Sequence, residues 1–443
     1  MKSRKPTLTA EERARAVKTI RGAGQTIAGT QAASKPSPTF DTLAGYKERE
    51  TLRKMSTSLG IGDPTFRQIA GHPSTISRIN GRDVLNFGSY DYLGLNADPR
   101  PANAAKEAID RYGVSASASR LTAGQRPIHL ELEKALAAHY DVEEALTFVS
   151  GHATNVSVIS TIMQKSDLII YDAFIHNSAS VGATLSAASR RSFPHNDLDA
   201  LEALLKDNAG HYRATLVVVE GHYSMDGDIP DLRRLLALKA RFGFWLMVDE
   251  AHSLGCIGPT GKGVREIYGV SGSEIDIWMG TLSKTLGSTG GYVAGNAALI
   301  DIIKYEAPGS VYSVALSPPL AAAAACSLAI LELEPERVAR LNARGTFFLE
   351  CAASLGLDTG TSIGSSIVPV MIGNSAIAVA LSMKLLERNI NALPIAFPGV
   401  PMNAARLRFF LTSEHTEEQI THALTETANI LLDLRDSPLS ALD

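Results

Sequence analysis

Cysteine is scarce in this chain of 443 residues. Its three cysteines, Cys256, Cys326 and Cys351, lie far apart, and none belongs to a CxxC pair. This spacing excludes a disulfide-stapled scaffold and a cysteine-type zinc site, and it is typical of proteins in a reducing compartment. We therefore predict a cytoplasmic protein without a metal centre.

Long apolar runs are also missing. No stretch approaches the ~20 apolar residues that a membrane-spanning helix needs. The longest candidate, residues 320–333, follows two prolines and ends in acidic residues, so it predicts a buried helix. The basic N-terminus is not followed by an apolar segment, which argues against a secretory signal. Charged residues make up only 20% of the chain and the formal net charge is −4, so a nucleic-acid partner is not expected.

The charge is unevenly distributed along the chain. Residues 1–40 contain eight Lys or Arg and two Glu, a balance of +6, which leaves −10 for the remainder. A basic arm of this kind is typical of a segment that docks an acidic partner. A solvated tail without a specific role is the competing interpretation.

From Val84 onward the pattern becomes regular, and short apolar runs alternate with helical segments such as residues 101–112 and 127–140. Continuous apolar runs are typical of strands buried on both faces, and their alternation with helices predicts an α/β fold with a mainly parallel central sheet. The runs are residues 145–149, 168–171, 216–219, 245–248 and 275–279. We divide the chain into a basic extension and linker (1–45), an N-terminal segment (46–95), a large domain (96–319) and a small C-terminal domain (320–443).

In parallel α/β sheets, ligands bind beyond the carboxyl ends of the strands. A lysine follows the last apolar run, between Gly280 and Gly287. The Lys284 amine can form a Schiff base with an aldehyde, and the hydroxyls of Thr281 and Ser283 can hold a phosphate. Taken alone, the motif is more typical of a surface lysine.

Other strand ends carry complementary groups. Asp249 and His252 follow one run, and His176 follows another. Gly151 and His152 open a helix after the first run, where backbone N–H groups can bind a phosphate. Each group has a structural alternative, such as a helix cap for Asp249 and a core or capping role for His176.

Together these strand ends supply a lysine, an acid, two histidines and two phosphate loops. This is the set that pyridoxal 5'-phosphate requires. The lysine would bind its aldehyde, the acid would keep its pyridine nitrogen protonated, a histidine would stack on its ring and the loops would hold its phosphate. We therefore predict a pyridoxal-phosphate enzyme.

Five further motifs follow one another from about Val84 to the C-terminus. They are residues 86–95, 195–197, 224–228, 249–255, and 406–408 ahead of 414–416. In their order and spacing the sequence resembles the α-oxoamine synthases, a family of fold-type I pyridoxal-phosphate enzymes. The loop at residues 88–92 is most similar to the serine palmitoyltransferase-like members.

The resemblance implies a fold-type I transferase with a smaller C-terminal α/β domain, and a homodimer whose subunits share their active sites. It assigns catalysis to Lys284, Asp249 and His176, and the cofactor's ring hydroxyl to His252 and Ser224. It places four residues at the phosphate: Gly151, His152, Thr281 and Ser283. Ser313 would reach the site across the dimer interface. Arg408, or the nearby Arg406, would bind the substrate together with Asn86 and Tyr92.

Two positions depart from the family pattern. Val314 stands where threonine is frequent, and His152 stands where an aromatic residue is usual. The first departure puts a cross-subunit phosphate contact in question, and the second a local contact at the cofactor.

The implied reaction is a decarboxylative Claisen condensation of an amino acid with an acyl thioester, either acyl-CoA or an acyl-carrier protein. Its products are a 2-amino ketone, CO₂ and a free thiol. An aminotransferase or a retro-aldol enzyme is the first alternative, because the cofactor site does not separate these reactions. An inactive partner subunit is the second, and the presence of Lys284 argues against it.

We predict that deletion of residues 1–40 lowers kcat/KM for an acyl-carrier-protein substrate, because such carriers are strongly acidic and the arm is basic. The loss should shrink as salt rises, since the Debye length falls from ~10 Å at 0.1 M to ~3 Å at 1 M. An acyl-CoA substrate serves as the control and should be nearly unaffected. An equal loss with both thioesters would identify a structural strap, and no loss with either would identify a plain tail.

Overall fold

The computed structural model describes residue 11 and residues 38–58, 60, 62–397, 399–401 and 403–436. The chain divides into two units, Met1–Gly60 and Ile61–Asp443. The first contains a short 3-10 helix, Phe40–Thr42, and helix α2 (Ala44–Ser58). Most of the predicted basic extension lies outside the described residues. Among the helices that are described, none has the length and apolar character that a bilayer crossing needs.

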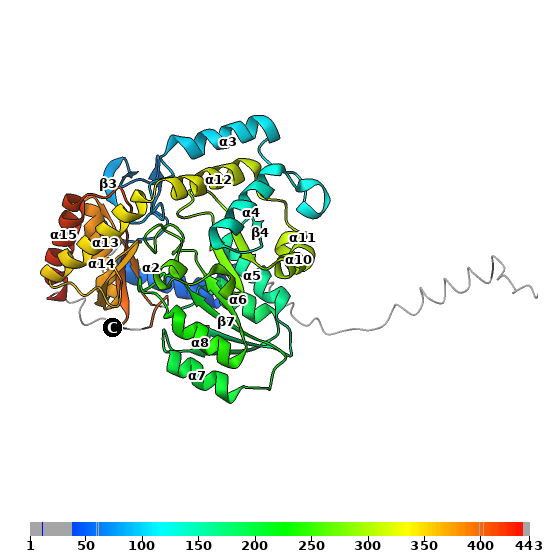
Figure 1. Ribbon diagram of the computed structural model, residues 1–443. Coiled ribbons are helices and arrows are strands. Elements are labelled where there is room, and N and C mark those ends of the chain that lie inside the picture. The colour runs from blue at the N-terminus through cyan, green and yellow to red at the C-terminus, as the bar shows by residue number, and fades with distance from the viewer. Residues whose placement is uncertain are drawn as a thin grey trace, which may run out of the picture. The chain divides into compact units, whose positions relative to one another are not determined.

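A seven-stranded sheet forms the centre of the second unit (Figure 1). In spatial order its strands are β4 (Glu144–Phe148), β10 (Gly291–Gly295), β9 (Ile277–Thr281), β8 (Trp245–Asp249), β7 (Thr215–Glu220), β5 (Leu168–Asp172) and β6 (Ser189–Phe193). Strand β10 is antiparallel to both neighbours, and the other pairings are parallel. The predicted mainly parallel sheet is confirmed, and each predicted apolar run forms a strand whose ends lie within two residues of the expected ones.

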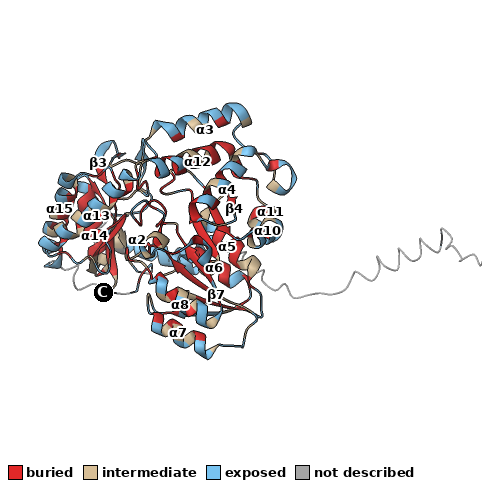
Figure 2. Ribbon diagram, in the orientation of Figure 1, coloured by how far each residue is buried: buried red, intermediate tan, exposed pale blue. Residues whose placement is uncertain are grey.

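Helices cover both faces of this sheet (Figure 1). One face carries α5 (Gly151–Ile162), α6 (Asn177–Leu185) and α10 (Ala297–Glu306); the other carries α4 (Pro127–Tyr140), α7 (Leu198–Asp207), α8 (Leu232–Phe242) and α12 (Pro318–Leu333). Each strand contributes to both cores because successive side chains point to opposite faces. In β7, Leu216 and Val218 belong to the core under α5 and α6, whereas Val217 and Val219 belong to the other core. Figure 2 shows these strands buried and the outer faces of α7 and α8 exposed.

Local signals determine several helix ends. Helix α3 (Pro99–Tyr112) begins two residues before the predicted start because Asp98 accepts a hydrogen bond from the Arg100 N–H and caps it. It ends at Gly113, whose φ of 78° favours glycine. The predicted buried helix at residues 320–333 is α12, which packs against α3 and α4. Two short helices, α9 (Val264–Tyr268) and α11 (Pro308–Val311), complete this part of the chain.

The C-terminal part forms a smaller α/β layer. Its antiparallel sheet has the order β11 (Ile367–Gly373), β14 (Ala405–Phe410) and β13 (Leu393–Ile395), and it packs with α13 (Glu336–Ser354), α14 (Ser375–Glu387) and α15 (Glu417–Arg435). A second sheet joins β1 (Ile69–Ala70), β2 (Ile76–Ile79) and β3 (Arg82–Asn86) to β12 (Ile390–Asn391). Segments from both ends of this unit therefore meet in one sheet. The four segments and their three boundaries given above remain predictions.

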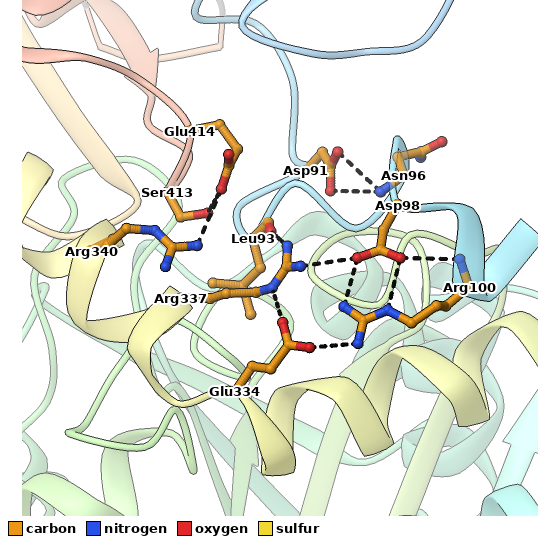
Figure 3. A network of polar contacts seen from close by, with 10 residues as sticks. All are labelled: Asp91, Leu93, Asn96, Asp98, Arg100, Glu334, Arg337, Arg340, Ser413 and Glu414. Atoms are coloured by element: carbon orange, nitrogen blue, oxygen red, sulfur yellow. Dashed lines mark hydrogen bonds and ion pairs between the residues drawn. The ribbon is translucent and has the colours of Figure 1, made fainter.

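A polar network anchors the loop between β3 and α3 (Figure 3). Arg337 donates a hydrogen bond of 3.0 Å to the Leu93 carbonyl and pairs with Asp98 and Glu334 at 2.9 and 2.7 Å. Arg100 pairs with the same two carboxylates, and its hydrogen bond lowers the pKa of Asp98 to about 2. The start of α3, the end of α12 and the start of α13 are thereby tied to this loop.

His195 links three strand ends at the carboxyl edge of the large sheet. It follows β6, and its Nδ1 lies 2.9 Å from Asp172 Oδ1 at the end of β5. Its Nε2 lies 3.0 Å from Asp228 Oδ2 in the loop after β7. Burial by itself lowers the pKa of His195, but the hydrogen bonds to the two carboxylates outweigh it and raise the pKa to about 9. The imidazole is therefore charged at neutral pH.

Because the folded pKa of His195 lies above the ordinary value of 6.5, the charged imidazole stabilises the fold fully below pH 6.5, and this stabilisation is lost as the pH rises through about 9. We expect His195→Gln to lower the melting temperature by roughly 2–5 °C at pH 6 and much less at pH 10. His211→Gln, at an exposed position, is the matched control and should leave the pH dependence unchanged. An equal loss at both pH values would mean that His195 contributes through its shape and not its charge.

Candidate active site

A cavity of about 210 Å³ opens at the carboxyl edge of the seven-stranded sheet. Its walls come from residues at or beyond the ends of β4, β5, β7, β8 and β9, so five strand ends contribute to one site. The lining residues are Ser150, Gly151, His152, Asn155, His176, Ser178, Glu220, Asp249, Ala251, His252, Met279, Thr281, Ser283 and Lys284. The structure thus brings together all of the predicted cofactor-binding residues except Ser224 and Ser313.

Asp249 is the last residue of β8, and its carboxylate is buried. Oδ2 accepts a hydrogen bond of 2.8 Å from Nδ2 of Asn155 in α5, and Oδ1 accepts one of 3.0 Å from the Ala251 N–H. The Asn155 amide also donates to Ser178 Oγ at 2.9 Å. The bond from Ala251 belongs to a turn and not to the helix cap that was the structural alternative, because the next helix begins only at Val264. The bond from Asn155 fixes the carboxylate from across the cavity wall.

Lys284 lies in the turn between β9 and β10. Its carbonyl accepts a hydrogen bond from the N–H of Gly287, which closes the turn with a φ of 56°. Burial lowers the pKa of Lys284 to about 8, against the attraction of Asp249. More of this amine is therefore unprotonated near neutral pH than of an ordinary lysine, and the unprotonated amine is the form that attacks a carbonyl carbon.

His252 lines the cavity, and the buried Tyr92 lies behind it. The Tyr92 hydroxyl lies 2.7 Å from Nδ1 of His252. Burial lowers the pKa of His252 well below its ordinary value and raises the pKa of Tyr92 well above its own, so both groups are neutral. Tyr92, which we expected at the substrate, is used here to orient His252.

His176 has the capping role that the sequence left open and also lines the cavity. It precedes α6, and its Nδ1 accepts a hydrogen bond of 3.3 Å from the Ser178 N–H and lies 2.7 Å from Ser178 Oγ. Burial lowers the pKa of His176, which favours the neutral ring.

The first turn of α5 forms the opposite end of the cavity. Ser150 caps the helix, and Gly151 and His152 begin it. A Cβ on Gly151 would lie 3.0 Å from Thr281 Oγ1, so glycine lets α5 and β9 approach closely. N–H groups in the first turn have no acceptor within the helix and bind anions. Ser283 is exposed beside this turn and lines the same end.

The two arginines of β14 have different partners. Arg406 is buried and pairs with Asp226, so its charge is neutralised. Arg408 donates from Nη1 to the Ser224 carbonyl at 2.8 Å, and its guanidinium lies 4.6 Å from the ring centre of Phe410. Its Nε is buried and has no hydrogen-bond partner within the described part of the chain. Arg408 therefore retains both charge and hydrogen-bonding capacity.

Asn86 and Ser313 are not among the residues that line this cavity. The Asn86 amide donates to Ser77 Oγ at 3.0 Å and accepts from Asn391 at 2.8 Å, so it is engaged inside the four-stranded sheet. Ser313 lies between the exposed Tyr312 and Val314, away from the residues that line the cavity of its own chain.

Several residues in and around the site were not predicted, and three of them lie beside Asp249 or Lys284. Asn155 lies one turn into α5. Glu220 is the last residue of β7, at the start of a stretch whose Asp-Gly and Gly-Asp pairs predict a turn. Tyr90 presents its ring 5.8 Å from the Lys284 amine. Their positions were visible in the sequence, but only the pairing of β7 with β8 makes Glu220 a neighbour of Asp249.

The donor set fits pyridoxal 5'-phosphate. Lys284 offers an amine for the aldehyde and Asp249 a carboxylate for the pyridine nitrogen, while neutral histidines flank the space for the ring. The space at Gly151 would be filled by a side chain. Because this space is open beside the first N–H groups of α5, a phosphate could bind there. The cavity is that of a pyridoxal-phosphate enzyme.

Comparison with known proteins extends this conclusion. Residues 82–426 match the family model described as aminotransferase class I and II. The chain is 37% identical over 378 residues to 8-amino-7-oxononanoate synthase of Bacillus pumilus. The aligned region covers 85% of this chain and 94% of the relative. It is 40% identical over 354 residues to the Symbiobacterium thermophilum enzyme of the same name, covering 80% and 90%. A serine palmitoyltransferase from S. paucimobilis, solved with PLP and myriocin bound, matches with a TM-score of 0.85 at 30% identity, covering 89% of this chain and 99% of that one.

The chain belongs to the aminotransferase class I and II family of pyridoxal-phosphate enzymes and, within it, to the α-oxoamine synthases. It is a C-acyltransferase that condenses an amino acid with an acyl thioester and releases CO₂ and a free thiol. The predicted family, fold, cofactor and reaction class are confirmed. The names of the relatives favour this reaction over the aminotransferase and retro-aldol alternatives.

Proposed function

We propose that the amino-acid substrate is alanine, with serine as the second candidate, and that the acyl donor is an acyl-CoA or an acyl-carrier-protein thioester. The product name of the relatives supports alanine, because the amino-bearing carbon and the terminal methyl of an 8-amino-7-oxononanoate are those of alanine. The similarity to serine palmitoyltransferase supports serine.

The main structural support for an amino-acid substrate is the guanidinium of Arg408. It has no carboxylate partner among the described residues, whereas Arg406 is neutralised by Asp226. Arg408 also lies close enough to Lys284 to lower the pKa of its amine. A substrate carboxylate bound by Arg408 would hold the amino acid beside Lys284 in a fixed orientation.

The remaining side chains have complementary tasks. Bound pyridoxal phosphate supplies an electron sink for negative charge on the substrate Cα. Lys284 accepts the Cα proton at Nζ, for which its low pKa is suited. Asp249, held by Asn155, keeps a proton on the pyridine nitrogen. His176 would stack on the ring, and His252, oriented by Tyr92, would face the ring hydroxyl.

We also propose a homodimer in which Ser313 reaches the partner's site. Tyr312 is 86% exposed and Val314 48% exposed, and they flank Ser313 in a segment bonded to the loop after α3, through Ala315 N–H to the Ala118 carbonyl at 3.0 Å. Large apolar side chains exposed together are typical of a surface that a second protein covers. The cytoplasmic location remains a prediction.

A substrate panel tests the proposed function. The pyridoxal-phosphate-loaded protein is incubated with alanine, serine or glycine and with acyl thioesters of short and long chain, and free thiol and CO₂ are measured. We expect equal amounts of both products, with the highest kcat/KM for alanine. Higher kcat/KM for serine would select the second candidate. Amino-group transfer to a 2-oxo acid without thiol release would contradict the condensation.

Arg408→Ala should raise the amino-acid KM more than the thioester KM. A charge-assisted hydrogen bond to a carboxylate contributes about 1.5–3 kcal/mol, which corresponds to roughly one to two decades in affinity. Arg406→Ala is the matched control, and it should lower the melting temperature because it leaves Asp226 without its partner. If Arg406→Ala raises the amino-acid KM and Arg408→Ala does not, the assignment of the two arginines is reversed.

A further inference from the structure

A buried carboxyl that no step above uses lies beside Asp249. Glu220 is the last residue of β7 and pairs in register with Asp249, the last residue of β8. Register partners on neighbouring strands point to the same side of a sheet, and both residues line the cavity. Two carboxyls so placed in an interior do not both ionise readily.

The hydrogen bonds of the two carboxyls differ. Asp249 accepts on both oxygens, from Asn155 and from the Ala251 N–H. Glu220 accepts a hydrogen bond of 3.0 Å from the Ser224 N–H through Oε2, whereas its Oε1 is buried without a hydrogen-bond partner among the residues described. The His176 N–H lies near this carboxyl and has a smaller influence on it than the Ser224 N–H. A buried charge without such bonds is costly, so this geometry favours the charge on Asp249 and a proton on Glu220.

The groups that face Glu220 lead to the same assignment. Burial, reinforced by Asp249 on β8, raises the pKa of Glu220 to about 8, against the lowering influence of Lys284 after β9 and of the His176 N–H before α6. Tyr223, on the same loop, is neutral because burial raises its own pKa well above the ordinary value.

We propose that Glu220 is a positioning residue that carries a proton in the working enzyme. As a neutral carboxyl it leaves Asp249 as the negatively charged member of the pair. It also holds the Ser224 N–H, and the Ser224 carbonyl in turn accepts from Arg408. An ionised Glu220 would favour the charged form of Lys284, so this residue sets the upper pH limit of the site.

This inference rests on the reaction class of the family and is independent of which amino acid is used. Amino-acid binding is therefore followed through the absorbance of the bound cofactor, which needs no thioester. Failure of the alanine proposal would leave this measurement intact, since any amino acid that changes the absorbance serves as the probe.

The test compares Glu220→Ala with Glu220→Gln in the cofactor-loaded full chain. Glu220→Ala removes the acceptor of the Ser224 N–H and should weaken amino-acid binding about tenfold. Glu220→Gln is a neutral acceptor of the same shape and should restore most of that loss. In the unaltered protein the cofactor absorbance should change near pH 8, and Glu220→Gln should lack this transition.

Melting temperature gives a readout besides activity. Because the pKa of Glu220 rises from 4.5 to about 8 on folding, the protein loses stability between these pH values, and Glu220→Gln should melt progressively higher than the unaltered protein across them. Glu250→Gln is the matched control. Glu250 is buried with a pKa raised to about 8, but it accepts from the Val264 N–H at 3.2 Å and does not line the described cavity. It should alter melting in the same direction and leave the absorbance titration unchanged.

Two results would overturn the proposal. One is a Glu220→Gln protein that binds the amino acid as weakly as Glu220→Ala, since the carboxylate would then be required. The other is identical absorbance titrations for the unaltered protein and Glu220→Gln between pH 6 and pH 9, since Glu220 would then not titrate in the site.

Discussion

The Asp249 carboxylate is a negative charge at the end of a strand that is buried on both faces, and two hydrogen bonds replace its lost hydration. A charge without such replacement is too costly for an interior. One donor, Asn155, comes from α5, so the helix must start close to the sheet. Gly151 and Gly291 permit this approach, because a Cβ on Gly291 would come within 2.6 Å of the Gly151 Cα.

The close packing of α5 against the sheet places different chemical groups along the cavity. The start of α5 offers N–H groups to an anion, while the ends of β7 and β8 hold the two carboxyls near Lys284. The histidines between them are neutral, because burial lowers the pKa of both His176 and His252. The start of α5 would thus suit an anion, the neutral histidines an aromatic ring, and the carboxyls with Lys284 a proton transfer, because a buried charge needs hydrogen bonds that only some parts of the wall supply.

Contacts outside the cavity hold its lining residues in position. His195 holds the ends of β5 and β7 through Asp172 and Asp228, and Tyr92 orients His252. Arg408, from the C-terminal sheet, donates a hydrogen bond to the Ser224 carbonyl in the loop after β7. The arginine that would bind the substrate and the lysine that would move its proton thus come from sheets that are far apart in the sequence.

The sequence by itself determined the strands that carry apolar runs, the buried helix α12 and the gathering of the lysine, the aspartate and the two histidines at one cavity. These depend on local pattern and on the rule that parallel strands end at one edge. It did not reveal β10, whose apolar run of three residues is short and bounded by glycines, or β6, which contains two arginines. It left Arg406 and Arg408 as alternatives, and it assigned Asn86 and Tyr92 to the substrate. Only the tertiary structure decided these points, because the deciding partners, Asp226, Asn391 and His252, belong to distant segments. Strand order does not follow chain order, so the neighbour of a buried polar group, and with it the location of a charge or a proton, is a property of the fold.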